Sequence, residues 1–436
     1  MKNKVGARNW CSFLLAGLVG QFAWTIENMY LNRYLYDVDS TKLDYVALMV
    51  ALSALVATLT TLFMGILSDR LGKRKIFISL GYMIWGITIV LFGIMKYSFV
   101  THAALLIVIM DCVMTFFGST ANDASFNAYV TDNTNTNNRG KVESVLSILP
   151  LVSMLFIVGV MDPLTRGNTL EEKRWDIFFY IFGVLVFVSG LILLFLLPKD
   201  KISSNKETSY IQNIFYGFKP STIKKNKMLY VVLLAFMLFN MAIQVFFPYF
   251  LIYIQNGAPK ISGADFTITL GIVLLLACII TVVFGLFMDK IGKNKILLPA
   301  LGTTIIGAIL MFFFIDQIGI MISGTILMTG YMVSTALLGA KVRDYTPEKE
   351  AGLFQGIRMV FAVLLPMVTG PYIGMGCYYI NKQVEVYPNE YGVMEEAVVP
   401  NQNIFLGAAI VLVFATLPLI YLIKKEKEIK NNASII

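Results

Sequence analysis

Long apolar runs dominate the chain, and short polar segments separate them. A run must hold about 20 apolar residues to cross a bilayer, and runs of that length recur twelve times along the 436 residues. Because a backbone in lipid finds no water to bond, each run is predicted to be an α-helix. The predicted spans are residues 10–33, 44–68, 75–96, 101–122, 142–161, 175–198, 227–255, 264–288, 295–315, 319–341, 353–376 and 402–423.

The longest polar connection between the spans is rich in lysine and covers residues 199–226. It divides the predicted spans into a first half, residues 1–198, and a second half, residues 227–436. The pattern therefore predicts an all-α membrane protein with twelve transmembrane helices in two six-helix halves, joined by a cytoplasmic loop.

Composition and charge agree with this pattern. Only 14% of the residues are charged and 57% are hydrophobic, whereas a soluble protein carries about 25% charged residues. With the N-terminus inside, 26 of the 35 lysine and arginine residues lie in inner segments, as the positive-inside rule requires. We therefore expect a multi-pass protein of the plasma membrane with both termini cytoplasmic. The net charge of +8 suits the anionic inner leaflet rather than nucleic acid.

Several chemical classes find no support in the sequence. The four cysteines (Cys11, Cys112, Cys278 and Cys377) form no CxxC pair, and His102 is the single histidine, so we expect neither disulfides nor a metal site. No phosphate-binding P-loop is present, which argues against ATP-driven pumping. We expect no cofactor, and an enzyme or a non-transporting receptor is the weakest alternative.

Two sequence cassettes occur once in each half. Gly65–Lys75 reads GILSDRLGKRK, and Gly285–Lys295 reads GLFMDKIGKNK. The segments around Asp132 (AYVTDNT) and Asp344 (AKVRDYT) also share alanine, valine, aspartate and threonine. Both pairs lie at matching places between spans, so the halves are predicted to be repeats of the same orientation, related by an axis along the membrane normal.

The cassettes are predicted to form a latch on the inner face that holds one conformation. Asp69 and Asp289 can accept hydrogen bonds from the next helix or from a nearby base, and the glycines permit close approach or tight turns. Asp132 is expected to belong to this network with Arg139. The predicted inner-gate residues are Gly65, Asp69, Arg70, Gly72, Lys73, Arg74, Asp132, Arg139, Gly285, Asp289, Gly292 and Asp344.

Ionisable residues inside spans are costly and therefore candidates for function. In the first span, Gln21, Trp24 and Asn28 share one helical face, which Glu27 borders. An aromatic ring can cover the apolar face of a pyranose, while amides and a carboxylate bond its hydroxyls. The alternative is a polar contact between helices that never meets substrate.

Asp111 begins a polar stripe in the fourth span, with Thr115 and Asn122 at helical spacing. Burial penalises a charged carboxylate, so Asp111 suits proton coupling, unless a neighbouring helix neutralises it for structure alone. Asp123 follows Asn122 directly, about three turns after Asp111, and could serve the substrate site or the inner gate.

In the second half, Arg358 lies two turns into the eleventh span and needs a partner, which the sequence does not identify. A carboxylate from the first half would let it bridge the two halves. Asn240, Gln244 and Tyr249 lie on the seventh span, where Pro248 should loosen the helix. Two interpretations of this span are equally open: the loosened helix lines the substrate site, or the kink serves packing alone. The predicted substrate-binding residues are Gln21, Trp24, Glu27, Asn28, Asn122, Gln244, Tyr249, Gln355 and Arg358; the predicted coupling residues are Asp111 and Asp123.

The Gly65–Arg74 run resembles the signature of the major facilitator superfamily between helices two and three, and Gly285–Lys293 resembles its second-half copy. Within that superfamily, Gly20–Asp37 (GQFAWTIENMYLNRYLYD) is similar to the first helix of the glycoside–pentoside–hexuronide cation symporters, and its QFAW start to their sucrose-transporter branch. The Asp344-Tyr345 pair and the Gly352–Arg358 stretch also look like that group. The resemblance implies a transporter that imports a sugar or glycoside with a cation by alternating access.

The chain departs from the melibiose-type members of that group. Gln21 stands where those members carry a sugar-binding acidic residue, and Ala57–Thr61 lacks the two carboxylates that ligate sodium in them. We therefore expect H⁺ rather than Na⁺ as the coupling cation. The expected partners are a sugar, the coupling cation and the lipid bilayer, and a monomer is expected.

The alternative is a proton-coupled exporter of drugs or metabolites with the same fold, because two acidic residues and an aromatic first helix also suit a lipophilic cation. The span 142–161 lacks the glycine–proline motif that drug antiporters of the superfamily carry in their fifth helix, which disfavours export.

Overall fold

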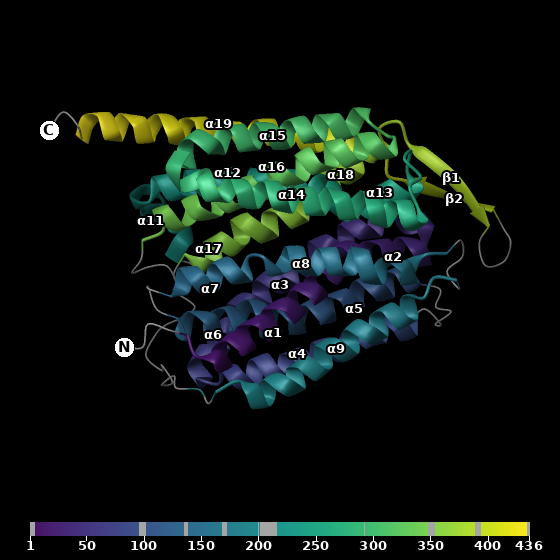
Figure 1. The fold of residues 1–436 in the computed structure, drawn as a ribbon, viewed down its shortest axis with the longest axis horizontal. Helices are drawn as coiled ribbons and strands as arrows, with labels where there is room; N and C mark the ends of the chain where they lie inside the picture. The colour runs from purple at the N-terminus through teal and green to yellow at the C-terminus, as the bar shows by residue number, and fades with distance from the viewer. Residues whose placement is uncertain are drawn as a thin grey trace. The chain divides into compact units, whose positions relative to one another are not determined.

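A computed structural model describes residues 5–95, 102–134, 138–167, 172–198, 200, 216–291, 293–347, 354–388 and 394–433. Nearly all of these residues are helical (Figure 1). Ten of the described helices are long and apolar enough to cross a membrane. The chain divides into two compact units, Met1–Ser209 and Tyr210–Ile436, which are described separately below.

The first unit contains α1 (Ala7–Thr25), α2 (Leu31–Val38), α3 (Asp44–Leu71), α4 (Arg74–Met95), α5 (Ala103–Gly118), α6 (Asn127–Asp132), α7 (Arg139–Leu146), α8 (Leu149–Phe156) and α9 (Trp175–Leu196). The first predicted span is helical throughout, because α1 continues through a π-helical turn (Ile26–Tyr30) into α2. A second π-helical segment, Ser119–Phe126, joins α5 to α6.

The predicted span 142–161 is not one continuous helix. It is divided between α7 and α8, and Pro150 occupies the first turn of α8. Proline lacks an N–H and cannot continue a preceding helix without losing a hydrogen bond, so the break falls just before it. A π-helical turn, Ile157–Met161, and a 3₁₀ turn, Asp162–Thr165, complete this segment.

The second unit contains α11 (Pro220–Lys225), α12 (Lys227–Phe246), α13 (Phe250–Asn256), α14 (Gly263–Ile291), α15 (Lys293–Phe313), α16 (Gln317–Tyr345), α17 (Gln355–Met359), α18 (Leu365–Tyr379), β1 (Gln383–Pro388), β2 (Met394–Val399) and α19 (Asn403–Ala433). The prediction that Pro248 interrupts the seventh span is confirmed, since a 3₁₀ turn at Phe247–Tyr249 separates α12 from α13. A π-helical turn, Val360–Leu364, likewise separates α17 from α18.

The strands β1 and β2 form an antiparallel hairpin in which Gln383 pairs with Val399 and Pro388 with Met394. The sequence analysis did not predict it. Figure 1 shows the hairpin projecting beyond the helix ends of its own unit. Such a hairpin carries its own backbone hydrogen bonds, so it needs no place among the helices.

Glycines allow α4 and α9 to pack backbone against backbone. A Cβ atom at Gly86 would lie 2.5 Å from the Phe187 nitrogen and 2.6 Å from the Gly183 oxygen. A Cβ atom at Gly190 would lie 2.8 Å from the Ser79 oxygen. Small residues bring helices together in lipid, where packing rather than water exclusion drives association.

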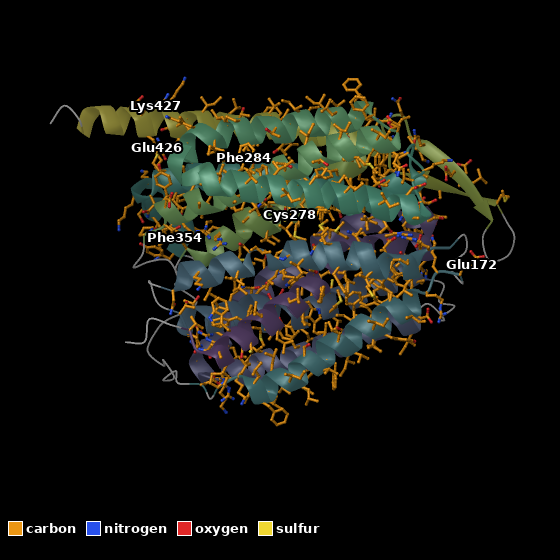
Figure 2. All side chains as sticks on the ribbon, in the orientation of Figure 1. Glu172, Cys278, Phe284, Phe354, Glu426 and Lys427 are labelled. Carbon is orange, nitrogen blue, oxygen red and sulfur yellow. The ribbon has the colours of Figure 1, made fainter. Side chains whose placement is uncertain are left out.

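The outward sides of the helices carry apolar side chains, as lipid contact requires. Five large apolar side chains on long helices are 52–72% exposed: Phe63, Val184, Phe195, Ile279 and Phe414. Figure 2 shows carbon-rich side chains along these sides of both units. Exposed apolar area on this scale is typical of a surface that faces a membrane.

Candidate functional site

Two buried carboxyl groups lie together in the first unit. Glu27 is 6% exposed and Asp111 is 1% exposed. Glu27 lies in the π-helical turn after α1, and Asp111 lies on α5. The Thr115 hydroxyl, one turn after Asp111, donates a hydrogen bond to Glu27 Oε1 at 2.9 Å. This bond joins the first span to the fourth span at the place where the sequence predicted their chemistry.

Each of these carboxyl groups keeps one oxygen without a partner. Glu27 Oε2 and Asp111 Oδ1 are buried and have no hydrogen-bond partner among the described residues. Asp111 shares a hydrogen bond with the side chain of Ser53 on α3. Glu27 interacts electrostatically with Asp111 and more weakly with Asp123. Buried acidic groups with unmet bonding capacity and no neutralising base are costly for the fold, which points to function.

The π-helical turns set the positions of these side chains. The Leu31 N–H bonds the Ile26 carbonyl, and the Asn127 N–H bonds the Asn122 carbonyl, both across five residues. A π turn shifts every following side chain relative to α-helical spacing, and such turns are frequent at functional sites. The face predicted for Gln21, Trp24 and Asn28 therefore holds only up to the turn.

Asp123 lies within the second π-helical segment and is partly exposed. The Ser119 hydroxyl donates to its Oδ2 at 3.1 Å. Asp123 is thus held by a hydrogen bond within its own helix. Its electrostatic effect on Glu27 is weaker than that of Asp111.

An aromatic and amide surface lies on the same helices. Trp24 is partly exposed and packs against Trp85 of α4, with ring centroids 5.2 Å apart. Trp85 in turn contacts Tyr82 edge to face at 5.6 Å. The Asn122 amide donates to the Tyr82 hydroxyl at 2.7 Å. The structure therefore brings two predicted binding residues, Trp24 and Asn122, into one cluster with Trp85 and Tyr82; Gln21 lies on α1 and is partly exposed.

Gly20 makes this arrangement possible. A Cβ atom there would overlap the Asn122 amide and come within 2.7 Å of the Tyr82 hydroxyl. The Tyr82 hydroxyl donates to the Ala16 carbonyl at 2.6 Å. Helices α1 and α4 are thus joined to the Ser119–Phe126 segment by a chain of hydrogen bonds that only glycine at position 20 accommodates.

Asn28 differs from its predicted role in one respect. Its amide nitrogen donates to the Trp24 carbonyl of its own helix at 2.8 Å. Side-chain bonds to the preceding turn are a local alternative to ligand contact. The amide oxygen of Asn28 remains the atom through which it could meet a ligand.

In the second unit, the predicted residues of the seventh span pack against α18 and the turn before it. Tyr249 is fully buried, and its hydroxyl donates to the Pro371 carbonyl at 2.9 Å. Gln244 lies against Gly370, and Asn240 donates to the Ala362 carbonyl at 2.9 Å. These contacts secure a kinked helix pair, which was one of the two alternatives for this segment.

The remaining predicted binding residues lie on α17. Arg358 is exposed, and its expected carboxylate partner in the first half stays a prediction. The side chain of Gln355 lies outside the described residues.

The first predicted gate cassette is an ion-pair network centred on Arg74. The Arg74 guanidinium contacts Asp69 at 2.5 Å and Asp132 at 2.7 Å, and donates to the Ser68 hydroxyl at 2.8 Å. Gly72 ends α3 with a φ of 61°, and its N–H bonds the Ser68 carbonyl at 2.9 Å. This left-handed cap explains the glycine.

The gate prediction is extended at Asp132 and corrected at Gly65. Asp132 pairs with Arg74, and its predicted association with Arg139 stays a prediction, because the side chain of Arg139 lies outside the described residues. A Cβ atom at Gly65 would lie 4.0 Å from the Cβ of Ala124, its nearest neighbour, so the contact between these two helices does not require a glycine at this position. Arg70 and Lys73 are exposed beside the network.

The sequence analysis missed a network in the second unit that includes Asn294 of the second cassette. Glu426 of α19 accepts hydrogen bonds from Lys341 at 2.7 Å, from the Tyr345 hydroxyl and from the Asn294 amide. Figure 2 places Glu426 on the C-terminal part of α19. Asp344 is exposed at the end of α16. The other predicted residues of the second gate lie outside the described residues, either entirely (Gly292) or in the burial of their side-chain positions (Gly285 and Asp289). The available signal was an acidic residue within the basic run KKEKEIK.

A further buried charge network at the other end of the first unit was also missed. Arg33 is 4% exposed, lies 3.4 Å from Asp162 and donates to the Thr165 hydroxyl at 3.0 Å. Asp37 accepts from Lys173 at 2.7 Å and from the Trp175 indole at 3.0 Å. This network ties α2 to the start of α9, and its signal was the Arg33–Asp37 spacing of one helical turn.

Comparisons with known proteins identify the family. The family model described as Major Facilitator Superfamily matches residues 10–371 and 261–435. No curated protein matches the sequence significantly.

Solved structures agree in fold. A bacterial homologue of the human lysosomal transporter Spinster, inward-facing and occupied, is 12% identical with a TM-score of 0.66, over 97% of this chain and 98% of that one. The xylose transporter XylE from E. coli is 14% identical with a TM-score of 0.65, over 93% and 96%. The nucleoside transporter NupG is 12% identical with a TM-score of 0.63, over 96% and 99%. The predicted fold class is confirmed, and the chain is a multi-pass membrane protein that belongs to the Major Facilitator Superfamily.

Proposed function

We propose that the protein is a secondary active transporter that moves a sugar or glycoside together with a cation, with H⁺ favoured over Na⁺. It would act by alternating access in the plasma membrane, with both termini cytoplasmic, as a relative of the glycoside–pentoside–hexuronide cation symporters. The observation that carries the proposal is the association of a buried carboxyl pair, Glu27 and Asp111, with an aromatic and amide surface on the same helices.

The aromatic and amide surface supports a sugar as substrate. Trp24 offers a ring face that can cover the apolar side of a pyranose. The Gln21 amide lies on the same helix, four residues before Thr25, and can bond the hydroxyls of the sugar. A sugar needs both kinds of contact, because its ring carbons are apolar and its edge is polar. XylE is named for xylose transport and NupG for nucleoside transport, and a nucleoside also contains a sugar.

The carboxyl pair supports cation coupling. Among the described residues, neither Glu27 nor Asp111 forms an ion pair. Charging both groups away from water would be costly, so the site favours the uptake of a cation. A cation and a sugar that bind one conformation better than the other shift the population toward that conformation, which is the requirement for coupled transport.

The test is solute-driven proton movement in proteoliposomes that contain a pH-sensitive dye. The purified protein is challenged with mono- and disaccharides and with nucleosides, each with and without Na⁺. Asp111→Asn is the test variant, and Asp265→Asn is the matched control, because Asp265 is an exposed acid at the start of α14.

Sugar-driven inward acidification without Na⁺, lost in Asp111→Asn and kept in Asp265→Asn, would support proton–sugar symport. A response that requires Na⁺ would reassign the cation. Proton flux driven by lipophilic cations, with no response to any sugar, would overturn the proposal and favour an exporter.

A further inference from the structure

We infer that Lys227, Tyr421 and Lys424 form a site for the phosphate group of an anionic phospholipid, whose acyl chains lie along the exposed side of α19. All three residues belong to the second unit. The site does not depend on which solute is transported. Only the leaflet that supplies the lipid rests on the orientation proposed above.

One side of α19 changes from apolar to aromatic to basic along the helix. Its residues follow one another at spacings of four and three, which keeps them on one face: Ile410, Phe414, Leu417, Tyr421 and Lys424. The three apolar side chains are 53%, 56% and 61% exposed, and Tyr421 is 41% exposed. Lys424 is exposed as well. This face is therefore an apolar track that ends at a ring and a positive charge.

The length of α19 places that change at the membrane surface. The helix has 31 residues, and about 20 residues are enough to cross the hydrocarbon core. About 20 residues from Asn403 onward end within one turn of Tyr421 and Lys424. Figure 1 shows the last turns of α19 extending past the end of α15. At this depth tyrosine and lysine side chains meet phospholipid headgroups.

A second helix brings another lysine to the same place. Lys227 is exposed in the first turn of α12, and its ammonium nitrogen lies 6.0 Å from the centroid of the Tyr421 ring. Lys424 follows Tyr421 by three residues, and side chains three apart are neighbours on a helix surface. Two positive charges from two helices therefore flank one exposed tyrosine. A phosphate group carries several acceptor oxygens and can bond both ammonium groups at once.

The acidic side chains nearby are engaged with other bases. Glu426 accepts a hydrogen bond from Lys341 at 2.7 Å, and Glu428 pairs with Lys425 at 2.7 Å. In the part of the chain that the structure describes, no carboxylate forms an ion pair with Lys227 or Lys424. The positive charge beside Tyr421 is thus available to an anion from outside the protein.

A lipid suits this site better than a free anion does. Exposed lysines attract a dissolved anion only weakly, because water screens the charges. A lipid that lies on the apolar track is already held at the surface by its chains, so its phosphate loses less freedom when it binds the lysines. In the proposed orientation this end of α12 and α19 lies at the inner leaflet, where anionic lipids are concentrated.

Native mass spectrometry of the purified full-length protein tests the site directly. The protein in detergent is titrated with phosphatidylglycerol and, separately, with phosphatidylcholine of the same acyl chains, and the lipid-bound fraction gives each Kd. The test variants are Lys227→Gln, Lys424→Gln and the double variant. Lys425→Gln is the matched control, because it removes the same charge one residue away, from a lysine that already pairs with Glu428.

Each test variant should bind phosphatidylglycerol about fivefold more weakly than the wild type, and the double variant about 25-fold more weakly, as expected for lysines at an anionic surface. Binding of phosphatidylcholine, whose headgroup has no net charge, should stay unchanged in every variant. An equal loss in Lys425→Gln would mean that any positive charge at the helix end attracts the lipid, and would overturn the site. No preference of the wild type for phosphatidylglycerol would overturn it too.

Two further measurements separate the alternatives. Lys424→Arg keeps the charge and should keep the affinity, so a loss as large as that of Lys424→Gln would contradict recognition of an anion. Glycerol phosphate, which has no acyl chains, should fail to displace phosphatidylglycerol. Displacement by glycerol phosphate as effective as that by the lipid itself would show a site for a dissolved anion and overturn the lipid assignment.

Discussion

Thr115 donates its hydroxyl hydrogen to Glu27 Oε1 at 2.9 Å, and this bond joins α5 to the π-helical turn that follows α1. Both residues are buried, at 0% and 6% exposure. The bond occupies Oε1 of Glu27 and leaves Oε2 without a hydrogen-bond partner among the described residues.

Thr115→Val should destabilise the protein by about 1–3 kcal/mol, because it leaves a buried carboxyl oxygen without its donor at nearly constant side-chain volume. Thr115→Ser keeps the hydroxyl and should retain most of the stability. Thermal unfolding of both variants in the same detergent measures the difference. Equal unfolding temperatures would show that the bond contributes nothing.

Trp24→Ala should weaken sugar binding by about 1–2 kcal/mol, a loss of roughly 5- to 30-fold in affinity, because it removes the ring that we propose covers the sugar. Trp24→Phe should keep most of the affinity. Equilibrium binding of the best substrate from the panel measures this, with Trp10→Phe near the start of α1 as the control. Unchanged affinity in Trp24→Ala would remove Trp24 from the site.

Arg74→Gln should destabilise the inner end of the first unit by about 1–3 kcal/mol, since Asp69 and Asp132 would face each other without their shared cation. The loss should stay below that of a fully buried ion pair, because the side chains of Asp69 and Asp132 are 29% and 33% exposed. The exposed Lys73→Gln is the charge-matched control. Adding Asp132→Asn to Arg74→Gln should restore part of the loss; no recovery would argue against repulsion as the cause.

Glu426→Gln should destabilise the second unit by about 1–3 kcal/mol, because the carboxylate of Glu426 is the common acceptor for Lys341, Tyr345 and Asn294. Glu428→Gln, two residues away, removes an exposed acid that pairs with Lys425 and should leave the unfolding temperature nearly unchanged, because exposed ion pairs contribute little. Thermal unfolding compares the two. A larger effect at Glu428 would contradict the network.

Gly86→Ala should destabilise the α4–α9 contact by about 1–3 kcal/mol, since the new methyl group would overlap the backbone of Phe187 and Gly183. Gly159→Ala is the matched control, because no atom lies within 4 Å of a Cβ there. A helical glycine changed to alanine in open space gains about 0.5–1 kcal/mol. Similar unfolding temperatures for the two variants would mean that the close approach is not rigid.

The sequence alone determined where most of the helices lie, predicted the repeated halves, and singled out Glu27 and Asp111. Span prediction depends on the summed hydropathy of neighbouring residues, which the chain carries locally. A carboxylate in an apolar run is costly wherever the helix lies, so its importance could be inferred without a partner. Pro248 acted in the same way, because a missing N–H breaks a helix from within.

The tertiary structure alone decided which side chains meet. Asp132 pairs with Arg74, 58 residues away, and Glu426 collects three donors from two other helices. Such pairs depend on how each helix is rotated about its axis, and a single π-helical turn, such as Ile26–Tyr30, changes that rotation for every later residue. Local sequence sets the cost of burying a charge, whereas only the packed helices determine which groups offset it.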